Sequence, residues 1–146
     1  MSGIVCPIRG GAASRSTIDK AIAIAQETGL PVYFLYVLDL GFLMHTMHVQ
    51  TGTISRELRE LGEFILLTAQ DRAAREGVQA ETVLREGEIV REAIAALCRE
   101  IDADYVIMGR PVEARDRNVF TPEMLERLTR DLEAEMNATV VFAGEA

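Results

Sequence analysis

Short apolar runs alternate with longer amphipathic runs along this chain, and that alternation restricts its fold more than any other feature. Strand–helix–strand units favour parallel pairing and right-handed crossovers. The alternation therefore predicts an α/β fold, one doubly wound parallel sheet with helices on both faces. The expected strands are residues 4–8, 32–40, 78–84, 105–108 and 139–142, and the expected helices run from Ser14 or Ser16 to about 28, from about 54 to 76, from 88 to 100, and from 121 to 137.

Helical spacing and helix-ending residues set the expected boundaries of these elements. Apolar residues recur at steps of three and four from Ile18 to Ala25, which places them on one helix face. Ser14 or Ser16 is expected to cap this helix at its start, and Gly29 to end it. Residues 32–40 (VYFLYVLDL) are apolar at successive positions, which predicts a strand covered by helices on both sides.

Three connecting segments are expected between these elements. Residues 41–53 form a loop or lid, residues 85–87 a turn, and residues 110–120 a polar, arginine-rich loop. Loops carry binding groups more often than the elements they join, so the first and third of these segments are of functional interest.

Length and charge narrow the function classes. A chain of 146 residues fits one domain, residues 1–146. With 15 Lys and Arg against 23 Asp and Glu, the net charge is −8, which disfavours binding to nucleic acids or anionic membranes. The chain has no apolar run long enough to cross a bilayer and no leader pattern at its start, and its two cysteines form no disulfide framework. A cytoplasmic, reduced protein is expected.

The fold itself indicates where a ligand would bind. Ligands of open parallel sheets bind beyond the carboxyl ends of the strands, where the strand order reverses. The loops expected there are residues 9–14 and 109–121, with Gly87 nearby. The first loop lacks the G-x-G-x-x-G pattern of dinucleotide-binding folds. It also begins with Arg9, where a phospho-acceptor receiver domain would need an acidic residue, and the only lysine is Lys20.

Several motifs together resemble the universal stress protein family over nearly the whole chain. They are Pro7-Ile8, the helix end Ala21 to Ala25, the strand Leu35 to Asp39, Gly87 with Ile89, Ile94 and Ala95, and above all Asp102-Ala103-Asp104-Tyr105-Val106-Ile107-Met108-Gly109. The resemblance implies a sheet in the order 3-2-1-4-5 and a homodimer. It also implies that one branch of the family binds ATP or AMP, through a motif of spaced glycines and an aspartate after the first strand.

The chain departs from that nucleotide motif at most of its positions. Gly109 matches the first glycine, but Val112 stands at the second and Pro122 or Glu126 at the third. Arg9 replaces the aspartate. Glycines let backbone N–H groups approach a phosphate, and side chains at these positions would crowd it. The resemblance therefore implies a non-catalytic regulatory or binding domain that does not bind ATP in the usual way, with a protein partner or small effector as its ligand.

The alternative is an adenine-nucleotide-binding stress protein that uses its arginine-rich loop. Arginines and a helix N-terminus can hold an anion without the glycine motif. The candidate ligand-binding residues are Arg9, Gly10, Val37, Gly87, Gly109, Arg110 and Thr121. The opposing interpretation pairs Arg115 and Arg117 with Glu113 and Asp116 on a solvated loop.

The remaining candidates favour structural roles. His45 and His48 could share a helix face and bind a metal, but no third ligand lies beside them, and a covering loop is favoured. Cys6 and Cys98 are expected to pack as small apolar residues. No catalytic base is visible, so no enzymatic activity is expected.

The last strand suggests how copies of the chain would associate. Val140, Val141 and Phe142 should lie at the edge of the sheet. An apolar edge strand invites pairing with another chain. The strand over residues 139–142 is therefore the expected interface of a homodimer.

Overall fold

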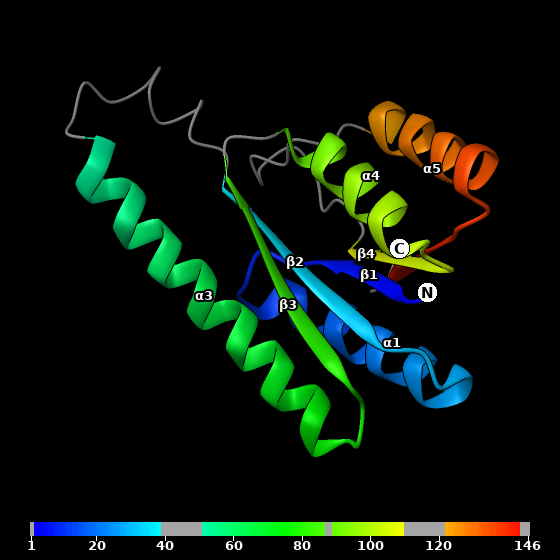
Figure 1. Ribbon diagram of the computed structural model, residues 1–146, viewed down its shortest axis with the longest axis horizontal. Helices are drawn as coiled ribbons and strands as arrows, with labels where there is room; N and C mark the ends of the chain where they lie inside the picture. Colours follow the sequence, from blue (N-terminus) through cyan, green and yellow to red (C-terminus); the bar gives the residue numbers. More distant parts are fainter. Residues whose placement is uncertain (1, 39–50, 87–88, 110–121, 144–146) are drawn as a thin grey trace.

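A computed structural model describes residues 2–38, 51–86, 89–109 and 122–143, in which strands and helices alternate (Figure 1). The strands pair in parallel in the order β3-β2-β1-β4-β5. The predicted α/β fold and the sheet order implied by the resemblance are both confirmed. The elements are β1 (Ile4–Pro7), α1 (Ala12–Thr28), β2 (Val32–Leu38), α3 (Thr51–Arg75), β3 (Ala80–Glu86), α4 (Val90–Ile101), β4 (Tyr105–Gly109), α5 (Pro122–Met136) and β5 (Thr139–Ala143).

Two helix layers enclose the sheet. Helices α1 and α3 cover one face, and α4 and α5 cover the other (Figure 1). The central strands supply side chains to both layers: Phe34 packs with the α1/α3 cluster and its neighbour Leu35 with the α4/α5 cluster. This confirms that the apolar run of β2 is buried on both sides.

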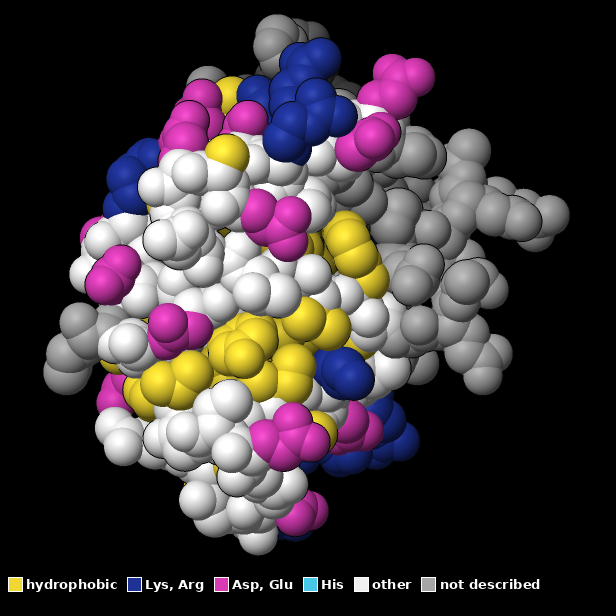
Figure 2. Space-filling view, turned by 90° about the vertical axis from the view of Figure 1, so that its right-hand side faces the viewer, with side chains coloured by type: hydrophobic (Ala, Val, Ile, Leu, Met, Phe, Trp, Pro, Cys, Tyr) yellow, Lys and Arg dark blue, Asp and Glu magenta, His cyan; other side chains and the backbone are white. Residues whose placement is uncertain are grey.

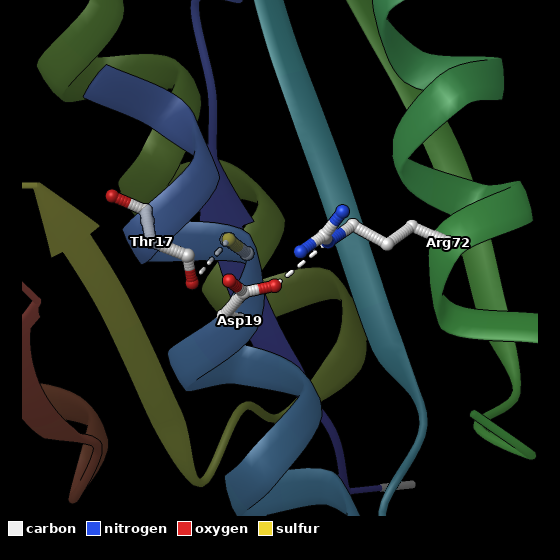
Figure 3. Close-up of polar contacts among 4 residues, drawn as sticks. Thr17, Asp19 and Arg72 are labelled. Carbon is white, nitrogen blue, oxygen red and sulfur yellow. Dashed lines mark hydrogen bonds and ion pairs between the residues drawn. The ribbon is translucent and has the colours of Figure 1, made fainter. Parts of the chain in front are cut away.

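Helix α3 lies along the sheet beside the edge strand β3 (Figure 1). It approaches closely because Gly62 has no side chain: a Cβ there would stand 2.7 Å from Tyr36 Cδ1 and 3.2 Å from Leu84 Cδ1. The Arg72 guanidinium of α3 also donates a 2.7 Å hydrogen bond to the Asp19 carboxylate of α1 (Figure 3). Exposed pairs of this kind contribute at most about 1 kcal/mol, so packing at Gly62 fixes α3 more firmly.

The predicted start of the first helix is wrong. Helix α1 begins at Ala12, its N-cap is Gly11, and no side chain caps it. Gly11 has φ 80° and ψ −177°, a conformation open to glycine but strained for other residues. The paired glycines thus let the chain turn earlier than the serines indicated. At the other end, Gly29 terminates α1 with φ 77°, as expected.

The predicted third strand and the turn after it are also misplaced. Arg85 and Glu86 are strand residues, because the pairing with β2 continues through Val37 and Leu38. Val78 precedes the strand instead: its N–H bonds the Ala73 carbonyl at 2.9 Å and so closes the end of α3. The prediction of a strand over residues 78–84 rested on their apolar side chains, but the pairing with β2 determines where β3 begins and ends.

Candidate functional site

The turn between β1 and α1 forms one side of the expected site. Pairing with β2 persists up to Ile8, whose N–H bonds the Leu35 carbonyl at 2.9 Å. Arg9 is then exposed, and the chain reverses at Gly10, which has φ 87°. A Cβ at Gly10 would stand 2.7 Å from Ile65 Cδ1 of α3. The backbone of this turn therefore lies directly against α3.

Ser14 closes this turn on itself. Its hydroxyl oxygen accepts hydrogen bonds from the N–H groups of Gly10 at 3.0 Å and Arg9 at 3.2 Å. The same hydroxyl donates to the Gly10 carbonyl at 3.2 Å. The Ser14 residue is only 8% exposed. The two amides that follow β1 are thus satisfied within the protein, a role that the sequence pattern assigned only as a helix cap.

The end of β4 meets the same helix one turn further along. Gly109 is exposed, and a Cβ there would stand 3.0 Å from Thr17 Oγ1, so α1 packs close to it. Ser14 and Thr17 are three residues apart and share a helix face. The structure therefore brings Arg9, Gly10 and Gly109 together at the start of α1.

Val37 faces the other helix layer. It packs with the α4/α5 cluster, on the opposite sheet face from its neighbour Tyr36, which packs with the α1/α3 cluster. Burial raises the pKa of the Tyr36 phenol, and the positive charge of Arg9 partly lowers it. Arg9 is therefore near Tyr36, a neighbour that no sequence motif indicated.

Two other cations described near the sheet's carboxyl end are already paired. Arg59 of α3 forms an ion pair with Glu86 at the end of β3. Arg85 donates from Nη2 to both carboxylate oxygens of Glu100, at 2.8 and 3.0 Å. Arg9 makes no ion pair with any described residue. Its exposed guanidinium is therefore available to an anionic ligand.

Several predicted residues lie outside the described part of the chain. These are Gly87, Arg110, Val112, Thr121, the acidic and basic residues of 113–117, and both histidines, His45 and His48. Of the two positions considered for the third motif glycine, Pro122 is the first residue of α5, and Glu126 lies within α5, where its carboxylate is 3.7 Å from the Arg130 guanidinium.

Both cysteines are packing residues, as expected. Cys6 and Cys98 are fully buried and unbonded to each other. Burial raises the pKa of both thiols, that of Cys98 to about 12. Thiols held protonated in this way are poor nucleophiles and poor metal ligands. Among the residues placed by the structure, no cluster of three His, Cys, Asp or Glu side chains could hold a metal ion.

The sheet ends at β5, which pairs with β4 on one side. Val140, Val141 and Phe142 are all half-buried. Viewed from this side, the surface carries a continuous hydrophobic patch between charged margins (Figure 2). The N–H of Val140 donates a long, 3.5 Å hydrogen bond to the Glu133 carboxylate. In the described segments, no helix is long and apolar enough to cross a membrane.

Comparisons with known proteins match the chain over nearly its full length. The model of the universal stress protein family matches residues 1–136. A universal stress protein of Methanocaldococcus jannaschii is 28% identical over 129 residues, covering 88% of this chain and 75% of that protein. A structure from the same family in Burkholderia pseudomallei superposes with a TM-score of 0.74 at 25% identity, covering 97% of this chain and 95% of that one. A universal stress protein of Archaeoglobus fulgidus, solved in complex with dAMP, has a TM-score of 0.64 at 19% identity, covering 99% and 98%.

Proposed function

Because the chain belongs to the universal stress protein family, we propose that residues 1–146 act as a single non-catalytic regulatory domain that functions by binding. Its ligand is a protein partner or a small effector, recognised by the loops after β1 and β4. The domain works as a homodimer in the cytoplasm, where its two buried thiols stay reduced.

The proposed domain does not bind ATP in the usual way. The observation that carries this proposal is the closed turn after β1. A phosphate at a helix N-terminus is held mainly by backbone N–H groups that point toward it. Here the N–H groups of Arg9 and Gly10 donate to Ser14 instead. The residues at the second and third glycine positions of the family motif, Val112 and Pro122 or Glu126, add side chains where backbone would have to approach a ligand.

Binding in place of catalysis is supported by the groups beside the turn. Two of the described carboxylates, those of Glu86 and Glu100, are held in ion pairs with arginines. The buried thiols of Cys6 and Cys98 are kept protonated. A general base or a nucleophile needs an accessible group with a pKa matched to its task.

A second candidate function is adenine-nucleotide binding. It is favoured by the dAMP complex of the Archaeoglobus fulgidus protein. It is also favoured by Arg9, which is exposed and unpaired among the described residues. In this alternative Arg9, Gly10, Gly87, Gly109, Arg110 and Thr121 hold the ligand, with Val37 near the base.

The absorbance spectrum of the purified protein distinguishes the two candidate functions. The chain has no tryptophan and three tyrosines, so its own absorbance is weak and bound adenine shifts the spectrum strongly toward 260 nm. We expect protein purified without denaturation to show a tyrosine spectrum. A co-purified adenine nucleotide, identified after acid precipitation, would refute the proposal in favour of the alternative.

The homodimer is proposed to form through β5. An edge strand with three consecutive half-buried apolar residues exposes backbone groups and apolar surface that a second copy can cover. Sedimentation equilibrium should return twice the 16.1 kDa mass of the chain. A monomer mass at micromolar concentration would refute the dimer.

A further inference from the structure

Helix α3 carries a line of large apolar side chains on its solvent side. Leu61, Phe64 and Leu67 are 49%, 67% and 58% exposed. Their spacing of three residues puts them on one face, about 9 Å long at 1.5 Å per residue. The opposite face of α3, with Leu66 and Ala69, is buried against the sheet. The outer line therefore contributes nothing to the core of this chain.

Carboxylates flank this apolar line. Glu57 and Glu60 are exposed on the same face, and neither makes an ion pair with a described residue. Asp71, one turn beyond Leu67, is neutralised by Arg75 at 2.9 Å. Of the exposed charges of α3 around the line that make no ion pair with a described residue, Glu57, Glu60 and Glu63 are negative and Arg56 is positive. The surface beside the line is thus negative on balance, in a chain whose net charge is −8. A surface of this kind attracts a positively charged partner.

A second copy of the chain does not fit this face. If two α3 helices packed antiparallel about Phe64, Glu57 of each copy would stand opposite the Asp71–Arg75 pair of the other, which offers it no free positive charge. If they packed parallel in register, Glu57 would face Glu57. The parallel arrangement opposes like charges, which is destabilising, and the antiparallel one leaves Glu57 without a positive partner. The acidic margin that Glu57 and Glu60 form therefore favours a partner other than a second copy of this chain.

We propose that the outer face of α3 docks a basic amphipathic helix of another protein. Two turns of such a helix match the length of the Leu61–Phe64–Leu67 line, and its apolar residues pack between those three side chains. Lysines or arginines beside its apolar stripe pair with Glu57 and Glu60. Phe64 is the central anchor, since aromatic residues at the middle of an interface contribute most to affinity.

The test uses a synthetic helical peptide with leucines at helical spacing, lysines flanking them, and one tryptophan. The protein has no tryptophan, so the peptide fluorescence reports binding directly. We expect micromolar binding that weakens as salt rises. A peptide with glutamates in place of the lysines should not bind. Absence of binding by the lysine peptide, or equal binding of both peptides, would overturn the proposal.

Variants locate the binding face. Phe64→Ser should weaken binding by about tenfold, the usual effect of losing a central anchor. Ile89→Ser removes a side chain that is 52% exposed at the N-cap of α4, away from α3, and should leave affinity within about twofold. Equal affinities of the two variants would contradict the proposal. A change of sedimentation mass in Phe64→Ser without peptide would show that a second copy occupies the face, and would overturn it as well.

Charge variants test the acidic margin independently and leave the apolar line intact. Replacing both Glu57→Gln and Glu60→Gln should weaken binding several-fold and flatten its salt dependence. Glu135→Gln, an exposed carboxylate of α5, is the matched control and should change neither. An unchanged salt dependence in the double variant would overturn the proposal. The α3 face is separate from β5 and from the turn after β1, so its failure would leave the proposed function intact.

Discussion

Replacing Ser14 by alanine tests the closed turn after β1. The variant removes an oxygen that accepts from the N–H groups of Arg9 and Gly10 and donates to the Gly10 carbonyl. No other hydrogen bond of these two N–H groups is seen among the described residues. We therefore expect Ser14→Ala to lower the free energy of unfolding and to expose both amides to solvent exchange.

The magnitude follows from the environment of each group. A hydrogen bond contributes about 0.5–1.5 kcal/mol net, and a buried donor left without a partner costs about 1–3 kcal/mol. Gly10 is half-buried and Arg9 is exposed, so water can replace the partner of the Arg9 amide more readily. Together these losses should lower the free energy of unfolding of Ser14→Ala by about 2 kcal/mol. The higher helix propensity of alanine offsets less than about 0.7 kcal/mol of this loss.

Urea denaturation measures this loss. With an m-value of about 2 kcal/mol/M, the midpoint should fall by about 1 M. Thr68→Ala is the control, because its exposed hydroxyl donates to the Phe64 carbonyl of its own helix and accepts no backbone N–H. Hydrogen exchange should accelerate at Arg9 and Gly10 in Ser14→Ala only. A midpoint no lower than that of the control, with exchange unchanged, would refute the closed turn.

Three further results are expected. Val141→Glu puts a charge on the half-buried edge of β5 and should convert dimer to monomer in sedimentation. Gly10→Ala should lower stability by about 1–2 kcal/mol in urea melts, because alanine is strained at φ 87° and its Cβ would meet Ile65 at 2.7 Å. Burial raises the pKa of the Cys6 and Cys98 thiols. Above pH 9.0, the ordinary thiol pKa, the unfolded chain therefore releases protons that the folded chain keeps, and stability should fall by about 1.4 kcal/mol per pH unit for each thiol.

Each of these results has a matched control. Thr139→Glu, at an exposed position of the same strand, should leave more dimer than Val141→Glu. Gly77→Ala has the same backbone strain, at φ 75°, without any contact within 4 Å, and should cost less than Gly10→Ala. Cys98→Ala should remove about half of the alkaline slope. Equal effects of variant and control, or an alkaline slope unchanged in Cys98→Ala, would contradict the respective explanations.

The strand and helix pattern could be predicted because it rests on local residue chemistry. The apolar run of β2 predicted burial on both faces, and Gly29 predicted the end of α1; both are confirmed. The boundaries of β3 could not be predicted in this way. Arg85 and Glu86 are polar and resemble a turn in sequence, but they are held as strand by pairing with β2. That pairing is a long-range contact, which no local pattern encodes.

The candidate site was predicted only in part. The fold placed Arg9, Gly10 and Gly109 at the carboxyl end of the sheet, and the structure brings them together beside α1. The bond from the Gly10 amide to Ser14 depends on where α1 starts, and the N-cap at Gly11 lies three residues before Ser14, the nearer of the two expected caps. The place of Val37 beside a ligand stays a prediction. The structure adds that its side chain packs on the α4/α5 side of the sheet, which the ligand motif does not reveal.

The most direct test of the central claim is calorimetric titration of nucleotide-free protein with ATP and AMP, with and without magnesium. The closed turn after β1 and the missing motif glycines predict no binding heat at any of several temperatures, which excludes an accidental zero of the enthalpy. Micromolar binding of either nucleotide would contradict the claim. It would show that Arg9 and its neighbours hold the phosphate without the family's glycine motif.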